Sequence, residues 1–314
     1  MNVPTRDDVK DAAKRIAGAV ERTPLTTHAI GDANVRIKWE SRQTGGSFKL
    51  RGASNRLLAL SDQERARGVV AFSSGNHARG VAIAARRLGI RATIVMPVDA
   101  PGVKLEATRA EGARIVTYDR MTESREQIAA RIAADTGATL VPSFDDPFII
   151  AGQGTVGLEL LEQSDEPVER ILVCCGGGGL SGGIALACPE AEIVVVEPVG
   201  WDDMARSIAA GTPQSVGDDP PLTLCDAIQT FRPAEATVAI LRDAGARGVQ
   251  VSEASVREAV RWAHERCAET VEPGGSVALA ALLSGVIEPR DGDIAIVSGG
   301  NVDPALHDRL VARD

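Results

Sequence analysis

A lysine at position 49 stands in a setting that suits covalent chemistry. The segment GGSFKLRGA (45–53) places Lys49 at the start of a predicted helix, with Ser47 as the expected cap. A positive charge in the first turn of a helix opposes the helix dipole, so this position favours the neutral form of the amine. A neutral lysine amine can attack a carbonyl carbon and form a Schiff base. The alternative interpretation is a solvated surface lysine.

A run of four glycines indicates a site for a phosphate group. It lies between a predicted strand over 170–175 and a predicted helix over 180–187, and it consists of Gly176, Gly177, Gly178 and Gly179. Glycines permit positive φ angles, so their backbone N–H groups can converge on an anion, and the helix N-terminus adds partial positive charge. The run matches neither glycine motif of dinucleotide or nucleoside-triphosphate sites, which favours another phosphate ligand. A flexible turn is the alternative.

Two polar turns follow other predicted strands. One lies between a strand over 68–73 and a helix over 76–88, and it contains Ser73, Ser74, Asn76 and His77. Hydroxyl, amide and backbone N–H groups suit a carboxylate, although Ser74 or Asn76 could instead be an ordinary helix cap. The other turn follows a strand over 293–297 and begins with Ser298. Ligands of parallel sheets bind at the carboxyl ends of the strands, so both turns are candidate parts of one site.

The elements that must position these residues alternate regularly between strand and helix. Further strands are predicted over 91–96, 114–118, 139–141 and 192–196, and further helices over 102–111, 122–135, 255–269 and 304–311. Continuously apolar strands that alternate with helices indicate parallel sheets covered on both faces, and hence an α/β fold. Ser252 or Ser255 is the expected cap of the helix over 255–269.

Length and composition restrict the classes of protein that the chain can be. Its 314 residues are enough for two domains. The formal net charge of −9 argues against nucleic acid or an anionic membrane as a partner. We find no signal-peptide core and no apolar run long enough to span a membrane, so a cytoplasmic protein is expected. The five cysteines include no C-x-x-C pair, which favours free thiols over a metal or redox site.

Seven segments together resemble the fold-type II enzymes that use pyridoxal 5'-phosphate (PLP), in particular the serine racemase and threonine/serine dehydratase family. They are SFKLRGA (47–53), SSGNHARG (73–80), AGQGT (151–155), GGGGLSGG (176–183), EPVGWDD (197–203), VEPGGSVALAALL (271–283) and SGGNVD (298–303). They occur in the family's order and cover nearly the whole chain. The resemblance implies a two-domain α/β fold like that of the tryptophan synthase β subunit. Residues 1–49 and 146–314 would form the large domain, and residues 50–145 the small one.

The resemblance assigns roles around PLP. Lys49 would hold the cofactor as a Schiff base, Phe48 would lie beside the ring, and Asn76 would hydrogen-bond the 3'-oxygen. Ser298 would meet the pyridine nitrogen, where a hydroxyl stabilises a pyridinium less than a carboxylate does. The phosphate would be bound by backbone N–H groups of the glycine run and the next residue: Gly176, Gly177, Gly178, Gly179 and Leu180.

It also assigns residues on the substrate side. Ser74 would lie across the cofactor from Lys49, so that the two residues could exchange the Cα proton from opposite faces. The substrate carboxylate would be surrounded by Ser73, Ser74, Asn76 and His77. Arg125 is similar to a substrate-side arginine of the racemase-like members, and its alternative interpretation is a solvated helix charge.

Glu197 and Asp203 are similar to the divalent-cation ligands of some family members. These two carboxylates and the backbone carbonyl of Trp201 would form an all-oxygen site for Mg²⁺, Ca²⁺ or Mn²⁺. Trp201 replaces the small residue expected there, but only its carbonyl is needed. The alternative is a strand-end glutamate and a capping aspartate.

By this resemblance, the protein is expected to dehydrate and deaminate a small β-hydroxy amino acid, giving a 2-oxo acid and ammonia. The candidate substrates are L-threonine, L-serine and 3-hydroxyaspartate. Two alternatives remain open. One is a serine or aspartate racemase, which Ser74 favours, and the other is a non-catalytic amino-acid-binding protein, which has no use for the Lys49 amine. The family is usually dimeric, so a homodimer is expected.

Overall fold

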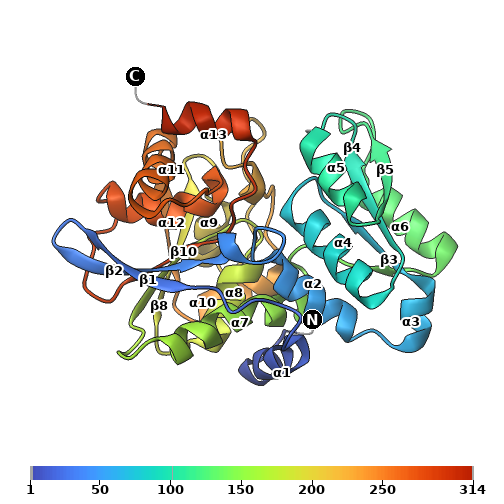
Figure 1. The fold of residues 1–314 in the computed structure, drawn as a ribbon, viewed down its shortest axis with the longest axis horizontal. Coiled ribbons are helices and arrows are strands. Elements are labelled where there is room, and N and C mark those ends of the chain that lie inside the picture. The colour runs from blue at the N-terminus through green and yellow to red at the C-terminus, as the bar shows by residue number, and fades with distance from the viewer. Residues whose placement is uncertain (1–2, 101, 313–314) are drawn as a thin grey trace.

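Two separate β-sheets form the centre of the fold (Figure 1). The computed structural model describes residues 3–100 and 102–312. In spatial order, the six-stranded sheet consists of β1 (Leu25–Ile30), β2 (Ala33–Trp39), β10 (Ile294–Val297), β7 (Arg170–Cys174), β8 (Glu192–Pro198) and β9 (Arg247–Val251). The four-stranded sheet consists of β5 (Arg114–Tyr118), β4 (Ala92–Pro97), β3 (Val69–Phe72) and β6 (Thr139–Leu140).

Helices pack around both sheets (Figure 1). They are α1 (Arg6–Ile16), α2 (Lys49–Leu58), α3 (Asp62–Arg67), α4 (Asn76–Leu88), α5 (Gly102–Ala110), α6 (Arg125–Thr136), α7 (Pro147–Gln163), α8 (Gly179–Ala187), α9 (Asp203–Ala210), α10 (Glu235–Asp243), α11 (Glu253–Cys267), α12 (Pro273–Leu283) and α13 (Pro304–Val311). Two short 3-10 helices are η1 (Glu40–Arg42) and η2 (Asp226–Ile228). In the described ranges, no helix is both long and apolar enough to cross a membrane.

The four-stranded sheet is covered on both faces, as the α/β fold class predicts. Val69 and Ala71 of β3 belong to an apolar cluster with α2 and α4, whereas Val70 belongs to a second cluster with Ala129 of α6. Successive strand residues point to opposite faces, so these two clusters lie on the two sides of the sheet. This double cover explains why the strands read as continuous apolar runs.

The strand pairs are parallel in both sheets with one exception. β1 and β2 form an antiparallel hairpin that runs from Leu25 opposite Lys38 to Ile30 opposite Ala33. The predicted parallel sheets are confirmed by all other strand pairs, and this edge hairpin was not predicted from the sequence. β1 has the mixed sequence LTTHAI, and Ile30 is its one buried residue, so the strand lacks the apolar run on which the prediction relied.

Helix starts near the pocket differ from the predicted ones. α2 begins at Lys49, but its N-cap residue is Phe48 and no side chain caps it. The predicted Ser47 cap is therefore wrong, and Ser47 instead pairs with Gly299 in an isolated β-bridge. Of the two candidate caps of α11, Ser252 is confirmed, because its hydroxyl accepts a hydrogen bond from the Ser255 backbone N–H.

The strands that lead to the pocket lie in the most buried part of the large core. β7 and β10 are buried along their whole length, and α12 packs against both. α7 and α8 meet where a Cβ on Gly183 would come within 2.5 Å of the Gly154 nitrogen. Glycine is required for this close packing, which fixes where α8 begins and thus where the glycine run lies.

Candidate active site

A pocket of about 540 Å³ lies where the carboxyl ends of β3, β7 and β10 converge. Ligands of α/β sheets bind at this end of the strands. Its wall brings together every residue that the sequence assigned to the cofactor or the substrate. They are Phe48, Lys49, Ser73, Ser74, Asn76, His77, Arg125, Gly176, Gly177, Gly178, Gly179, Leu180 and Ser298. Their individual roles stay predictions, but they are close enough to act on one ligand.

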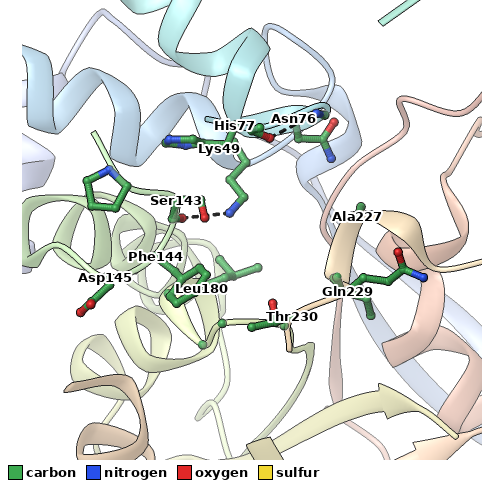
Figure 2. A pocket seen from close by; sticks show the side chains of 18 of the residues that line it. Lys49, Asn76, His77, Ser143, Phe144, Asp145, Leu180, Ala227, Gln229 and Thr230 are labelled. Carbon is green, nitrogen blue, oxygen red and sulfur yellow. Dashed lines mark hydrogen bonds between the residues drawn. The ribbon is translucent and has the colours of Figure 1, made fainter. Parts of the chain in front are cut away.

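Lys49 extends into this pocket, and its amine donates a 3.0 Å hydrogen bond to the carbonyl oxygen of Ser143 (Figure 2). Burial lowers the pKa of the amine from 10.5 to about 8, although Cys174 and Glu272 oppose this shift. The N-terminus of α2 at Lys49 acts in the same direction as burial. The surface-lysine interpretation is therefore wrong, and the amine is a better nucleophile near neutral pH than a solvated lysine.

The glycine run is shaped so that side chains do not fit. Gly178 has φ +84°, and a Cβ on Gly176 would lie 2.8 Å from the carbonyl oxygen of Ile228. A Cβ on Gly177 would overlap the ring of Phe144. Gly178 is also the N-cap residue of α8 and provides no side-chain cap, so the first N–H groups of that helix remain for an anion. The glycine run thus forms a concave backbone with N–H groups that could bind an anion.

The serine loop, residues 73–77, leads from β3 into α4. The N-cap residue of α4 is Gly75, and no side chain caps the helix. Neither Ser74 nor Asn76 is therefore an ordinary helix cap, and that alternative is wrong. Both side chains remain for other contacts inside the pocket.

Glu272 is a buried acid to which the sequence prediction gave no role. It lines the pocket, and its Oε1 accepts a 2.6 Å hydrogen bond from Nδ2 of Asn76. Oδ1 of Asn76 accepts a 2.8 Å bond from Asn301, so the orientation of the Asn76 amide is fixed at both ends. Burial raises the pKa of the Glu272 carboxyl to about 8. Glu272 lies in the quoted segment VEPGGSVALAALL, where an acid beside an apolar helix was the available signal.

The imidazole ring of His77, the last residue of the serine loop, is buried. Its Nε2 lies 2.9 Å from the Val141 carbonyl oxygen, which can only accept, so Nε2 carries the proton. Burial, reinforced by the charge of Lys49, lowers the pKa of this imidazole to about 3. Nδ1 is then unprotonated and cannot donate to an anion. A contact of His77 with a substrate carboxylate must therefore come from its backbone N–H.

Arg125 lies at the first turn of α6, at the wall of the pocket. Its Nε donates a 2.8 Å hydrogen bond to Glu126, and its guanidinium lies 5.5 Å from the ring centre of Phe72. Its side chain is 43% exposed. The position of Arg125 is compatible with both a substrate-side arginine and a solvated helix charge, because its side chain is partly exposed and also lines the pocket.

The comparison with known proteins decides the family. The sequence model of the pyridoxal-phosphate dependent enzymes matches residues 16–299. The chain belongs to this family. An L-threo-3-hydroxyaspartate ammonia-lyase from a Pseudomonas species is 44% identical, over 96% of this chain and 97% of the relative. Its counterpart from Saccharomyces cerevisiae is 41% identical, over 99% and 98%. The solved structure of maize serine racemase superposes with a TM-score of 0.92 at 38% identity, over 97% of this chain and 96% of that one.

The residues of the pocket fit the cofactor of this PLP family. The Lys49 amine has a lowered pKa, as a lysine that bonds to an aldehyde requires. The glycine run is a backbone cradle that a Cβ would fill, which suits a phosphate. Ser298 is 3% exposed and turns toward the same pocket, where a hydroxyl can meet the ring nitrogen.

The three residues expected to bind a divalent cation lie outside the wall of this pocket. Glu197 is fully buried, and its carboxylate accepts 2.9 Å hydrogen bonds from the backbone N–H groups of Met204 and Ala205. Asp203 is 1% exposed, and its Oδ2 has no hydrogen-bond partner among the described residues. Burial raises the pKa of Asp203 to about 7 and that of Glu197 well above its ordinary value.

These two buried acids are compatible with a cation but do not complete a site. Across residues 3–100 and 102–312, no three or more His, Cys, Asp and Glu side chains are grouped to hold a metal ion. A cation there would need further oxygen ligands, and the Trp201 carbonyl predicted from the sequence is one candidate.

Proposed function

We propose that this PLP-family protein dehydrates and deaminates a small β-hydroxy amino acid to a 2-oxo acid and ammonia. The observation that carries the proposal is the Lys49 amine, which has a lowered pKa and lies in one pocket with the glycine run and the serine loop. Two relatives named L-threo-3-hydroxyaspartate ammonia-lyase are 44% and 41% identical to this chain, and one named L-threonine ammonia-lyase is 37% identical. Each alignment covers nearly the whole chain.

The chain's residues would divide the work of binding the cofactor. Lys49 would bond to its aldehyde carbon, and the glycine run with Leu180 would bind its phosphate through backbone N–H groups. Asn76 would donate to the 3'-oxygen, Ser298 would meet the ring nitrogen, and Phe48 would lie beside the ring. When bound, PLP supplies an electron sink that stabilises negative charge at the substrate Cα.

The catalytic proton transfers fall to Lys49. With PLP bound, the neutral Lys49 amine would remove the substrate Cα proton. The electron pair of the broken C–H bond would form the Cα–Cβ double bond, and the β-hydroxyl would leave as water by taking up the proton that Lys49 had accepted. Hydrolysis of the released product then gives the 2-oxo acid and ammonia. The serine loop would hold the substrate carboxylate, through its hydroxyl and backbone N–H groups, so that the Cα hydrogen faces Lys49.

Among the candidate substrates, the charges in the pocket favour 3-hydroxyaspartate over L-threonine and L-serine. Its second carboxylate requires a cation, and the pocket wall contains Lys104, Arg125 and Arg232 besides Lys49. Lys104 pairs with Asp226 at 2.5 Å, and Arg125 pairs with its neighbour Glu126. Arg232 forms no hydrogen bond or ion pair within residues 3–100 and 102–312, so it is the cation most available for that carboxylate.

Racemisation of serine or aspartate is the second candidate. Ser74 lines the same pocket as Lys49, and a hydroxyl on the opposite face of the substrate could return the Cα proton there. The structural similarity to maize serine racemase is consistent with this activity. A non-catalytic amino-acid-binding protein is disfavoured, because binding alone gives no reason to lower the pKa of Lys49.

We also propose a structural divalent cation, Mg²⁺, Ca²⁺ or Mn²⁺, bound by Glu197, Asp203 and the carbonyl of Trp201. The support is the unpartnered Asp203 Oδ2 and the two buried carboxyls, whose charges repel each other unless a cation is present.

The proposed division into two domains follows the sheets. All strands of the four-stranded sheet lie within 50–145, and all strands of the six-stranded sheet lie within 1–49 or 146–314. A homodimer, expected from the family resemblance, and a cytoplasmic location, expected from the sequence, remain part of the proposal.

The decisive experiment measures 2-oxo acid release from L-serine, L-threonine and the 3-hydroxyaspartate isomers in parallel, with PLP and Mg²⁺. Strong release from one substrate, abolished in a Lys49→Ala variant, is the expected result. A yellow protein that releases no 2-oxo acid but interconverts enantiomers would support the racemase instead. A protein that binds no PLP would refute both activities.

A further inference from the structure

The backbone of Ser298 is held on both sides by hydrogen bonds, and its hydroxyl hydrogen is free to turn toward a partner. Ser298 follows β10, its N–H donates to the Gly275 carbonyl at 3.1 Å, and its carbonyl accepts from the Phe48 N–H at 3.2 Å. The side chain is 3% exposed and faces the pocket. The direction in which its hydroxyl hydrogen points therefore depends on the groups that touch the oxygen.

One such group is the thiol of Cys174, the last residue of β7. β7 and β10 are parallel neighbours, with Ile171 opposite Ile294, and this register brings their carboxyl ends side by side. The Cys174 thiol donates a hydrogen bond to Ser298 Oγ at 3.1 Å. Cys174 is 4% exposed and also lines the pocket.

The thiol of Cys174 keeps its proton at neutral pH. Burial raises the pKa of Cys174 to about 11, while the hydrogen bond with Ser298 opposes this shift. A neutral thiol is a donor, whereas a thiolate could only accept and would draw the Ser298 hydrogen toward sulfur. Within residues 3–100 and 102–312, the Ser298 hydroxyl accepts from Cys174 but donates to no group, so its hydrogen remains for a ligand.

We infer that Cys174 is a positioning residue, whose thiol hydrogen commits the Ser298 hydroxyl to donate to the ring nitrogen of PLP. This inference rests on the proposed function, because it needs PLP in the pocket. The hydrogen bonds then run in one direction, from Cys174 to Ser298 to the ring nitrogen, and each strengthens the next. A ring nitrogen that accepts this bond stays unprotonated, which limits the cofactor as an electron sink and suits elimination better than transamination.

The test is ¹⁵N NMR of the holoprotein loaded with PLP that carries ¹⁵N at the ring nitrogen. The wild type should show an unprotonated, hydrogen-bonded nitrogen at neutral pH. Cys174→Ala removes the donor to Ser298, so the resonance should move toward that of free unprotonated PLP. Cys174→Ser provides a stronger donor at the same place, so its resonance should move the opposite way.

Cys175→Ala is the matched control. Cys175 is equally buried and adjacent, but its sulfur contacts the Ser181 hydroxyl and the Gly176 carbonyl instead of Ser298. The ring-nitrogen resonance of PLP bound to Cys175→Ala should equal that of PLP bound to the wild type.

Three results would overturn the inference: a protonated nitrogen in the wild type, an unshifted resonance in both Cys174 variants, or a shift of the same size in Cys175→Ala. Cys174→Val provides a second apolar variant if Cys174→Ala is unstable. Failure of the proposed function is distinguishable, because a wild type that binds no PLP gives no ring-nitrogen signal from the protein at all. A wild type that binds PLP but turns over no hydroxy-amino acid still reports on Cys174, since the measurement needs no substrate.

Discussion

A lysine amine bonds to an aldehyde only when it is neutral, so the burial of Lys49 has a measurable consequence. The pKa of this amine is about 8 instead of 10.5. Below the pKa, the neutral fraction of the amine rises about tenfold for each unit by which the pH increases, and above the pKa it becomes constant. We predict that PLP uptake by the cofactor-free protein becomes faster up to about pH 8 and then levels off. Stopped-flow absorbance across this range measures the rate, and a plateau reached only near the ordinary lysine pKa would contradict the prediction.

We predict that Arg232, which lines the pocket, governs the choice of substrate in the proposed reaction. Replacing it by glutamine leaves the side-chain carboxylate of 3-hydroxyaspartate without a cationic partner. A hydrogen bond to a charged group contributes about 1.5 to 3 kcal/mol, so kcat/KM for 3-hydroxyaspartate should fall roughly 10- to 150-fold. L-serine has no such carboxylate, and its kcat/KM should change little. Arg257→Gln, at an exposed arginine outside the pocket wall, is the control. Equal losses for both substrates would assign Arg232 a different role.

At the scale of elements, the turn from β7 into α8 depends on the absence of side chains. Gly177→Ala would push a methyl group into the ring of Phe144, which lines the same pocket. We predict that the variant folds but binds PLP at least about tenfold more weakly, because the displaced N–H groups no longer converge on the phosphate. Gly217→Ala is the matched control, since a Cβ there would meet no atom within 4 Å. Equilibrium titration by absorbance gives both affinities, and unchanged binding in Gly177→Ala would remove the glycine run from the cofactor site.

The elements that could be predicted from the sequence are those with a clear pattern. β7 and β10 were predicted because they are buried on both faces and read as short apolar runs between turns. α12 is buried along almost its whole length and α7 is buried from Ile149 to Gly157, so these stretches have no polar face and no helical period that would identify them.

The residues of the site that could be predicted are likewise those that stand in a recognisable segment. Lys49, the glycine run and the serine loop stand in segments with their own local signature. Cys174 and Glu272 matter through contacts across the sheet or between distant segments, with Ser298 and Asn76 as partners. Periodicity and motif spacing describe neighbours in the chain, so contacts of this kind cannot be read from them.

At the scale of the whole molecule, the pocket depends on contacts between segments that are far apart in the chain. Asn76 at the start of α4 bonds to Glu272 at the start of α12, and Ser47 pairs with Gly299. The first contact joins the α4 side of the pocket, next to the four-stranded sheet, to the α12 side, next to the six-stranded sheet (Figure 1). A ligand that bridges the serine loop and the glycine run would therefore draw the two sides together.

The pair of buried acids at α9 couples stability to pH and to divalent cations. The pKa of Asp203 is raised from 3.8 to about 7, so its contribution to stability is present in full below 3.8 and is lost as the pH rises through about 7. A cation binds the ionised carboxylates, so its stabilising effect should grow over the same range. We predict that Mg²⁺ raises the unfolding temperature more at pH 8 than at pH 6, and that Asp203→Asn abolishes this increase. The variant should also lose less stability with rising pH when no cation is present.

Asp202→Asn, at the partly exposed neighbour, should behave like the wild type. Thermal unfolding with Mg²⁺ or with a chelator at both pH values measures all three proteins. If Mg²⁺ has the same effect on Asp203→Asn as on the wild type, the two acids are a structural pair and the cation binds elsewhere.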